Sequence, residues 1–336
     1  MPLAQERGPS GASAEAGPVL VLGGTGFLGR HVCAAFADAG REVLAVNRRP
    51  PRPGFPHRSL SLDVSTAPAD LLVDVVRALR PGVVVNAAGG AWTTAESEMI
   101  SGNIVVTERI VQAITLASHP VRLIQLGSVL EYGPVPYGES VGERTGARPQ
   151  SAYGRTKLAA TQAVLAAAAT GRVNGLVLRL TSVAGPGLPP VSLLGRVAEQ
   201  LLDASRQGRE AVIELSPLRA QRDYVDFRDA ADAVVAAADR RAATGRAIAV
   251  GSGAAVPVRA LVNLLIQVSG IPTRIVESEL ARPARSRERA EVDWLQVDPG
   301  AAAETLGWRP RRSLEDSVRA LWADVAVPRP QVTAGS

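Results

Sequence analysis

The sequence contains very little cysteine and no long apolar run. Cys33 is the single cysteine in 336 residues, which excludes an internal disulfide and argues against a thiolate metal cluster. No apolar run approaches the roughly 20 residues that a membrane-spanning helix needs. The N-terminal residues 1–17 also lack the apolar segment of a signal peptide. We therefore expect a cytoplasmic protein with no membrane association and no metal site.

Lysine is nearly absent as well. Of the 37 basic residues only Lys157 is a lysine, and the others are arginines spread along the chain. The net charge of +5 favours polyanionic partners such as nucleotides, nucleotide-sugars or nucleic acid. A chain that uses arginine everywhere else and keeps one lysine points to a chemical role for that ammonium group.

Short apolar runs alternate with helical patterns through the first half of the chain. The runs VLVLG (19–23), VVVN (83–86) and RLIQLG (122–127) are apolar on both faces, as in parallel strands that helices cover on both sides. This alternation predicts an α/β fold with a doubly wound parallel sheet, the Rossmann fold. Further helices and strands are expected near 103–118, 121–127, 150–170, 174–181 and 191–207.

The alternation loosens after residue 183, where a Pro/Gly-rich segment follows. We expect a nucleotide-binding domain at 18–183 and a smaller α/β substrate lobe at 184–325. Part of 222–250 is expected to return to the large sheet. The segments 1–17 and 326–336 are rich in Gly, Ala, Ser or Pro and are predicted to be disordered tails.

A glycine-rich turn follows the first predicted strand. The segment GGTGFLG reads GxxGxxG and runs directly into a helical pattern. Glycines allow a tight turn and let backbone N–H groups and the helix N-terminus approach a pyrophosphate, although an ordinary glycine-rich turn is the alternative. We predict a dinucleotide phosphate loop, with the cofactor contacts at Gly23, Thr25, Gly26, Phe27 and Leu28.

The end of the second predicted strand is where an acidic side chain would hold the adenosine ribose of NAD. The chain has no acid there and reads Val46, Asn47, Arg48, Arg49. Two arginines can neutralise a 2′-phosphate and stack on adenine, so we predict NADPH as the cofactor. The alternative is that both arginines only begin a solvated loop.

Tyr153 and Lys157 are four residues apart at the start of a predicted helix, so their side chains lie on one helix face. A tyrosine hydroxyl is a poor base at neutral pH, but an ammonium group nearby stabilises the phenolate and lowers the pKa of the tyrosine. The pair is therefore a candidate acid/base. A surface pair is the alternative, since the Tyr-x-x-x-Lys spacing also occurs by chance.

Ser128 follows the strand predicted at 121–127, and ligands of open α/β sheets bind at the carboxyl ends of the strands. Its hydroxyl could donate to a carbonyl oxygen on which negative charge develops. The alternative is a turn serine that bonds its own backbone.

Several motifs in a fixed order complete the pattern. Over residues 18–325 the chain resembles the extended short-chain dehydrogenase/reductase family, the NAD(P)-dependent nucleotide-sugar epimerases, dehydratases and reductases. The resemblance rests on GGTGFLG (23–29), NAAG (86–89), Ser128 with EYG (131–133), Tyr153-x-x-x-Lys157, RDYVDFRD (222–229) and the tail segments VDPGA (297–301) and LGWRP (306–310).

The resemblance implies roles for individual residues. Tyr153 would be the acid/base, Lys157 would hold the nicotinamide ribose, and Ser128 would complete the triad. Further cofactor contacts would be Asp63, Val64, Ala87, Ala88, Gly89, Thr181 and Val183. The substrate would be contacted by Ser182, by Arg222 on its diphosphate, and by one of Arg282, Arg287 and Arg289. Trp92 and Thr93 follow the strand at 83–86 and are candidates for the sugar pocket, with loop packing as an equal alternative.

Departures from the family patterns narrow the reaction. A dehydratase of the family would need an acidic pair where Val129 and Leu130 stand, and a 3,5-epimerase-reductase would need a Cys/His pair, whereas Cys33 and His31 fall on the first predicted helix. We therefore predict an NADPH-dependent ketoreductase of a nucleotide-activated, dTDP-linked 4-keto-6-deoxyhexose. An NAD-dependent 4-epimerase is the first alternative, and a non-catalytic dinucleotide- or RNA-binding relative is the second. We expect a homodimer formed through the helices near 103–118 and 158–169.

Overall fold

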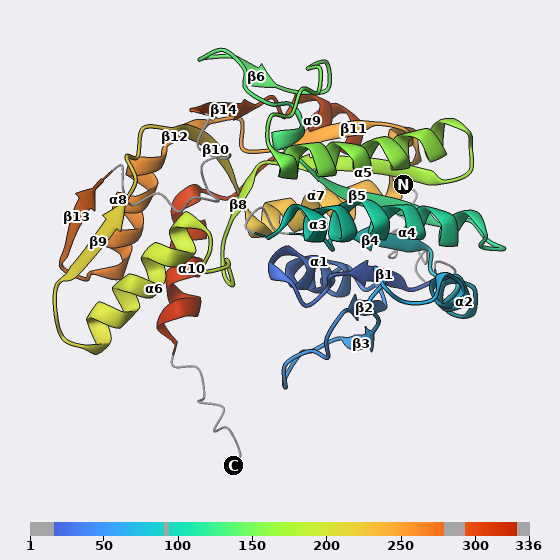
Figure 1. Cartoon of the computed structure of the whole chain (residues 1–336), viewed down its shortest axis with the longest axis horizontal. Coiled ribbons are helices and arrows are strands. Elements are labelled where there is room, and N and C mark those ends of the chain that lie inside the picture. The colour runs from blue at the N-terminus through green and yellow to red at the C-terminus, as the bar shows by residue number, and fades with distance from the viewer. Residues whose placement is uncertain (1–16, 91–93, 279–292, 328–336) are drawn as a thin grey trace, which may run out of the picture.

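The computed structural model describes residues 17–90, 94–278 and 293–327. Its main layer is a parallel sheet of seven strands in the order β11-β7-β5-β4-β1-β2-β3 (Figure 1). The order reverses between β1 and β4, and ligands of doubly wound sheets bind at such a reversal. This is the Rossmann arrangement expected from the sequence. The strands are β1 (Val19–Leu22), β2 (Val43–Asn47), β3 (Arg58–Ser61), β4 (Val83–Asn86), β5 (Arg122–Ser128), β7 (Asn174–Leu180) and β11 (Ala247–Val250).

Burial on both faces of the sheet explains why its strands are continuously apolar. Val19 and Val21 belong to one core cluster and Leu20 and Leu22 to the other, because successive side chains of a strand alternate between faces. Helices supply the rest of each cluster. The first cluster is completed by α1 (Phe27–Asp38), α7 (Phe227–Asp239) and α9 (Gly300–Leu306), and the second by α2 (Ala69–Leu79), α4 (Val106–Thr115) and α5 (Ala152–Ala169).

A second group of elements has a hydrophobic cluster of its own and lies to one side of the large sheet (Figure 1). Its helices pack beside a two-stranded sheet and a mixed sheet in the order β12-β10-β14-β6, with β8 paired to β10. The boundary predicted near residue 183 remains a prediction. The elements of this cluster are α6 (Leu193–Arg206), α8 (Val258–Ser269), α10 (Leu314–Ala326), β8 (Ser182–Ala184), β9 (Ala211–Leu215) and β13 (Thr273–Glu277). The mixed sheet also contains β6 (Ser140–Val141), β10 (Gln221–Asp226), β12 (Ala255–Pro257) and β14 (Trp294–Val297), of which β6 and β14 pack in a separate small cluster with Val129 and Tyr132.

Part of 222–250 returns to the large sheet, as expected. Only β11 joins it, while β10 pairs with β8, β12 and β14. The sequence AIAV of β11 is apolar on both faces and suits a covered parallel strand. In contrast, β10 carries Asp223, whose buried carboxylate accepts from the N–H groups of Ser252 (2.8 Å), Gly253 (2.9 Å) and Val297 (3.1 Å) around the mixed sheet.

The helix expected near 103–118 begins earlier, at α3 (Glu96–Met99), and passes through a π-helical turn, η1 (Ile100–Val105), into α4. Asn103 lies inside this turn rather than capping a helix. Its Oδ1 accepts from the Gly90 N–H (3.1 Å) and its Nδ2 donates to Thr156 Oγ1 (3.0 Å). The side chain therefore joins the loop after β4 to α5, and bonds of this kind leave no trace in local sequence. In the described ranges no helix combines the length and apolarity that a bilayer span requires.

Acidic residues of RDYVDFRD anchor α10 rather than a ligand. Asp226 accepts from Ser317 Oγ (2.8 Å), and Asp229 accepts from the N–H groups of Arg311 and Arg312 (both 2.9 Å). The Arg312 guanidinium also bonds Asp229 (2.6 Å). The motif therefore contributes mainly to the packing of α10 on the start of α7.

Arg122 is a buried cation at the start of β5, and its side chain bonds the C-terminal end of α7. Its guanidinium donates to the carbonyl oxygens of Ala237 and Arg240 and to the side chain of Asn174. Burial, with a smaller contribution from Arg241, lowers the pKa of Arg122 to about 10, so it stays charged at neutral pH. We expect Arg122→Met to lower the free energy of unfolding by about 3 kcal/mol, because it leaves buried acceptors unpaired.

Denaturant unfolding measures this loss. The matched control is Arg77→Met, which removes an exposed guanidinium that bonds one helix-end carbonyl, that of Leu116, and should change stability by less than about 0.5 kcal/mol. Equal effects of the two substitutions would contradict the structural role given to Arg122.

Candidate active site

The turn between β1 and α1 is built so that only glycine fits at key positions. Gly23 has φ +74°, and a Cβ there would lie 2.8 Å from the Ala88 nitrogen. A Cβ on Gly29 would lie 2.0 Å from the Gly23 oxygen. The turn therefore brings β1, the loop after β4 and the N-terminus of α1 together, as a pyrophosphate site requires.

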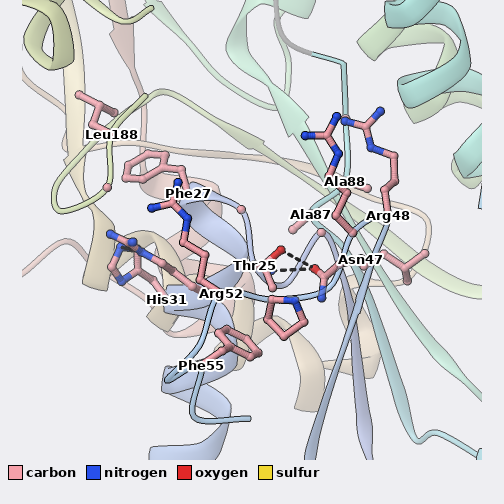
Figure 2. A pocket seen from close by; sticks show the side chains of 18 of the residues that line it. Thr25, Phe27, His31, Asn47, Arg48, Arg52, Phe55, Ala87, Ala88 and Leu188 are labelled. Carbon is pink, nitrogen blue, oxygen red and sulfur yellow. Dashed lines mark hydrogen bonds between the residues drawn. The ribbon is translucent and has the colours of Figure 1, made fainter. Parts of the chain in front are cut away.

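A cavity of about 1500 Å³ opens at this turn and extends along the β2–β3 loop to α6 and α10. Figure 2 shows part of its wall, with Arg48 and Arg52 projecting on either side of Thr25 and Asn47. Leu28 is an exception to the predicted contacts, since it packs against the core on α1. The predicted cofactor residues that line the cavity are Gly23, Thr25, Gly26, Phe27, Asn47, Arg48, Arg49, Asp63, Val64, Ala87, Ala88 and Gly89.

Asn47 carries an unsatisfied donor in the wall of this cavity. Its Oδ1 accepts from the Thr25 N–H (2.8 Å) and from Thr25 Oγ1 (3.0 Å). A backbone N–H can only donate, so the amide orientation is determined and Nδ2 faces away from Thr25. Nδ2 is buried and has no acceptor in the part of the chain that the structure describes. Such a donor is costly unless a ligand oxygen accepts from it.

The turn after β3 also lines the cavity and is held in place by hydrogen bonds. Asp63 Oδ1 accepts from the N–H (3.0 Å) and the hydroxyl (2.5 Å) of Ser65. The hydroxyl bond, together with the charge of Arg48, keeps the pKa of Asp63 below its usual value. Arg109, on α4, donates to the Val64 oxygen (2.9 Å). This rim is therefore preorganised, with Arg48 close enough to Asp63 to influence its charge.

His31 lies in the cavity wall, although its place on the first helix suggested a position away from the site. Its Nε2 is 3.0 Å from the Pro186 oxygen, and its ring packs 4.3 Å from that of Phe227. Burial lowers the pKa of His31, so its imidazole is neutral at pH 7. Cys33 faces the core instead, where burial raises the pKa of its thiol to about 12 and makes it unreactive.

Lys157 is a buried cation, which is incompatible with a surface Tyr/Lys pair. Its side chain is 6% exposed, and Nζ donates to the Leu126 oxygen at 2.5 Å, near the end of β5. Burial lowers the pKa of Lys157, and the charge of Glu131 opposes this effect. Tyr153 lies one turn earlier on α5 and is half-buried. The Lys157 amine therefore lies near the carboxyl end of β5, the strand end at which the sequence predicted the reaction.

Ser128 ends β5 and is 8% exposed. Its Oγ accepts from the Leu130 N–H (3.2 Å), so the turn-serine alternative describes part of its geometry. Accepting this bond occupies a lone pair and leaves the hydroxyl proton available for a carbonyl oxygen. The local bond and the predicted role are therefore compatible.

Ser128, Tyr153 and Lys157 are not among the residues that line the cavity, and the other predicted residues lie away from it or outside the described residues. Thr181 is buried and its hydroxyl donates to the Asp223 oxygen (2.9 Å). Ser182 and Val183 are half-buried on β8, which pairs with β10, and Arg222 is half-buried on β10. Burial lowers the pKa of Arg222. Trp92, Thr93, Arg282, Arg287 and Arg289 lie outside the described residues.

The doubly wound sheet, its glycine turn at the strand-order reversal and the polar groups at the end of β5 define a dinucleotide-binding enzyme of the Rossmann class. The chain belongs to the NAD dependent epimerase/dehydratase family, whose model matches residues 19–251. This confirms the family inferred from the sequence motifs.

Two relatives and one solved structure show how similar the chain is to proteins of known activity or ligand. The chain is 44% identical over 305 residues to the dTDP-6-deoxy-L-talose 4-dehydrogenase (NAD(P)(+)) of Kitasatospora kifunensis, covering 90% of this chain and 94% of that protein. It is 26% identical over 312 residues to the GDP-6-deoxy-D-mannose reductase of Pseudomonas aeruginosa, covering 91% and 96%. Among solved structures, MoeE5 in complex with UDP-glucuronic acid and NAD has a TM-score of 0.76 at 27% identity, covering 91% of this chain and 98% of MoeE5.

The residues present fit a nicotinamide dinucleotide. Gly23 and Gly29 make room for a pyrophosphate at the start of α1, and the buried Asn47 amide donor requires an acceptor that the described protein residues do not supply. Ala87 and Ala88 leave a small-residue floor beside β4. The cavity volume also exceeds the roughly 300–1000 Å³ of common ligand pockets, as an extended ligand requires.

Proposed function

We propose that the enzyme reduces the 4-keto group of a nucleotide-activated 4-keto-6-deoxyhexose, dTDP-linked, with NADPH as the reductant. The observation that carries the proposal is the buried Lys157 side chain, which bonds the Leu126 oxygen two residues before Ser128 on β5 and lies one helical turn from Tyr153 on α5. Positive charge in a dry site stabilises an oxyanion far better than it does in water. The relative from Kitasatospora kifunensis supports the sugar position, since a 4-dehydrogenase and a 4-ketoreductase run one reaction in opposite directions.

Three side chains divide the work of the reduction. When bound, NADPH supplies a hydride to the carbonyl carbon of the sugar. The Ser128 hydroxyl donates a hydrogen bond to the carbonyl oxygen, and Tyr153 gives its phenolic proton to that oxygen as it becomes a hydroxyl. Lys157 stabilises the phenolate that remains until a proton from solvent restores it.

The wall of the cavity supports NADPH over NADH. The end of β2 carries Asn47 in place of an acid, and Arg48, Arg49 and Arg52 line the cavity directly after it. Guanidinium groups recognise phosphate oxygens in a bidentate manner. A 2′-phosphate would therefore have cationic partners here.

The residues directly after Ser128 do not supply the acid that elimination of water from the sugar would need. Val129 is a buried apolar side chain, and Leu130 packs on the same cluster. The next acid, Glu131, is fully buried and bound to Arg179 (2.7 Å), so it has no path to a sugar carbon. A dehydratase is thus unsupported. A cytoplasmic location and a homodimer remain predictions.

Purified enzyme incubated with dTDP-4-keto-6-deoxyglucose and either NADPH or NADH tests the proposal. We expect NADPH oxidation in step with loss of the keto sugar, with kcat/KM at least about tenfold higher for NADPH than for NADH, a difference of about 1.4 kcal/mol. Interconversion of C4 epimers without net oxidation of added cofactor, by protein that retains NAD, would instead identify a 4-epimerase.

A further inference from the structure

Glu131 places a carboxylate in the protein interior, directly behind the proposed site. It ends the short 3₁₀ helix η2 (Val129–Glu131) and its side chain has no exposed surface. Oε1 accepts from the Ser128 N–H (2.8 Å), while Oε2 accepts from Thr161 Oγ1 (2.8 Å) and Arg179 Nε (2.7 Å). These partners belong to β5, α5 and β7. One carboxylate therefore joins the strand end that carries Ser128 to the helix that carries Tyr153 and Lys157.

This arrangement exceeds what a helix cap needs. Ser128 and Glu131 form a capping box around η2, which uses Oε1 alone. The second oxygen is committed to α5 and β7. A Cβ on Gly127 would lie 2.6 Å from Oε1 and 2.9 Å from Val177 Cγ1, so a side chain there would displace the carboxylate or the valine. Glycine inside a strand marks a close approach of neighbouring groups, and here the carboxylate of Glu131 is the nearest of them.

Lys157 shares this buried region with Glu131. Thr161, which bonds Oε2, is one turn after Lys157 on α5, and residues four apart lie on one helix face. On β5 the ammonium bonds the Leu126 oxygen, and Glu131 bonds the Ser128 N–H two residues later. Both charges are therefore attached to the same strand end and the same helix face. The charge of Glu131 opposes the burial that lowers the pKa of Lys157.

Arg179 is the second cation of the group. It is 7% exposed, forms an ion pair with Glu131, and places its guanidinium 4.6 Å from the ring centre of the buried Tyr132. Without the carboxylate, Arg179 would lose its ion-pair partner and Lys157 would lose the charge that opposes the effect of its burial. Arginine does not release its proton in proteins, so the lysine would be the one to become neutral.

We infer that Glu131 is a positioning residue that keeps Lys157 in its ammonium form and holds the turn that presents Ser128. The catalytic consequence rests on the proposed function. The claim that Glu131 keeps Lys157 in its ammonium form does not rest on the proposed function, because it concerns the protein without cofactor or substrate. Loss of the Lys157 charge would leave the Tyr153 phenolate without its counter-ion and so slow the proton transfer.

Few other charges bear on Lys157. The elements packed against α5 are β5, β7, η1, η2, α3 and α4. Within α5 itself the nearby groups are Tyr153, one turn before, and the exposed Arg155. The other charged side chains of these elements are exposed or engaged elsewhere: Glu96, Glu98 and Glu108 face solvent, Arg109 bonds the turn after β3, and Arg122 binds the end of α7. The titration of Lys157 should therefore respond to Glu131, Arg179 and Tyr153.

The single lysine of the chain makes a direct measurement possible. Protein labelled with [ε-¹³C]lysine gives one lysine side-chain signal, whose chemical shift reports the protonation of Lys157 as pH is varied. We expect the midpoint of this titration to lie at lower pH in Glu131→Gln than in the wild type, because a compensating charge is lost. In Arg179→Gln it should lie at higher pH, because a like charge is lost.

Thr161→Val is the matched control, since it removes one hydrogen bond to Glu131 and leaves every charge in place. Its midpoint should equal that of the wild type. An unchanged or higher midpoint in Glu131→Gln would overturn the inference, and so would an unchanged or lower one in Arg179→Gln. If Glu131→Gln does not fold, the Arg179→Gln titration decides alone.

Turnover provides a second readout. With the keto sugar and NADPH, Glu131→Gln should lose about 10- to 100-fold in kcat with little change in KM for NADPH. If the wild type does not reduce the keto sugar but the titration midpoints shift as expected, the proposed function is refuted and the inference about Glu131 stands. If the wild type reduces the keto sugar but the variants have the same Lys157 titration midpoint as the wild type, the inference about Glu131 is refuted and the proposed function stands.

Discussion

Replacing Tyr153 with phenylalanine is expected to lower kcat for keto-sugar reduction by about 10²- to 10⁴-fold, the range that general acids contribute. The change removes the phenolic proton donor and keeps the ring on α5. The dissociation constant for NADPH should change by less than about twofold, since the substitution removes no charge. Steady-state turnover and fluorescence titration of NADPH measure the two quantities.

Tyr137→Phe is the matched control for this loss. Tyr137 is 73% exposed, and its hydroxyl accepts from Gln221 Nε2 (3.0 Å) on the outer part of the mixed sheet. Removing that hydroxyl should leave kcat unchanged. A kcat of Tyr153→Phe within about threefold of the wild-type value would refute the acid/base role, because loss of a general acid lowers the rate by much more than that.

Replacing Arg48 and Arg49 together with serine should reverse the cofactor preference. Each charge-assisted hydrogen bond to a phosphate contributes roughly 1.5–3 kcal/mol, so KM for NADPH is expected to rise by about 10- to 100-fold or more. KM for NADH should change by less than about threefold, because NADH lacks the 2′-phosphate. Kinetics with the two cofactors at fixed keto-sugar concentration separate these effects.

Arg58→Ser is the control for the loss of positive charge in this region. Arg58 follows the same loop but is exposed and paired with Glu42 (2.5 Å), and it does not line the cavity. It should alter neither KM. Equal losses with NADPH and NADH in the double variant would show that Arg48 and Arg49 support the loop rather than recognise the 2′-phosphate.

The order of strands and helices was readable because local patterns encode it. The apolar runs of β1, β4 and β5 alternate between two covered faces, and GGTGFLG requires the turn that the structure shows at Gly23 and Gly29. The helix expected near 103–118 begins earlier, at Glu96, and Asn103 lies inside it, where its amide bonds Gly90 and Thr156. Part of 222–250 was expected to return to the sheet, and β11 does so, while β10 takes its partners from β12 and β14, a pairing that the sequence did not indicate.

The candidate site was only partly readable. The four-residue spacing of Tyr153 and Lys157 marked the acid/base pair, and the acid-free end of β2 marked the cofactor rim. The place of His31 in the cavity wall was missed, because it depends on the loop at Pro186, 155 residues away. The buried amide donor of Asn47 had no signal in the sequence either, since it follows from the bond to Thr25.

The sequence alone predicted the Rossmann class, the phosphate-binding turn and a chemical role for the single lysine. Each of these depends on residues that are neighbours in the chain or four positions apart. The charge balance around that lysine emerged only on folding. Glu131, Lys157 and Arg179 come from η2, α5 and β7, all three side chains are buried, and Glu131 forms an ion pair with Arg179. Short-range patterns record which residues a helix or strand presents, whereas the pairing of buried charges depends on how separate elements pack.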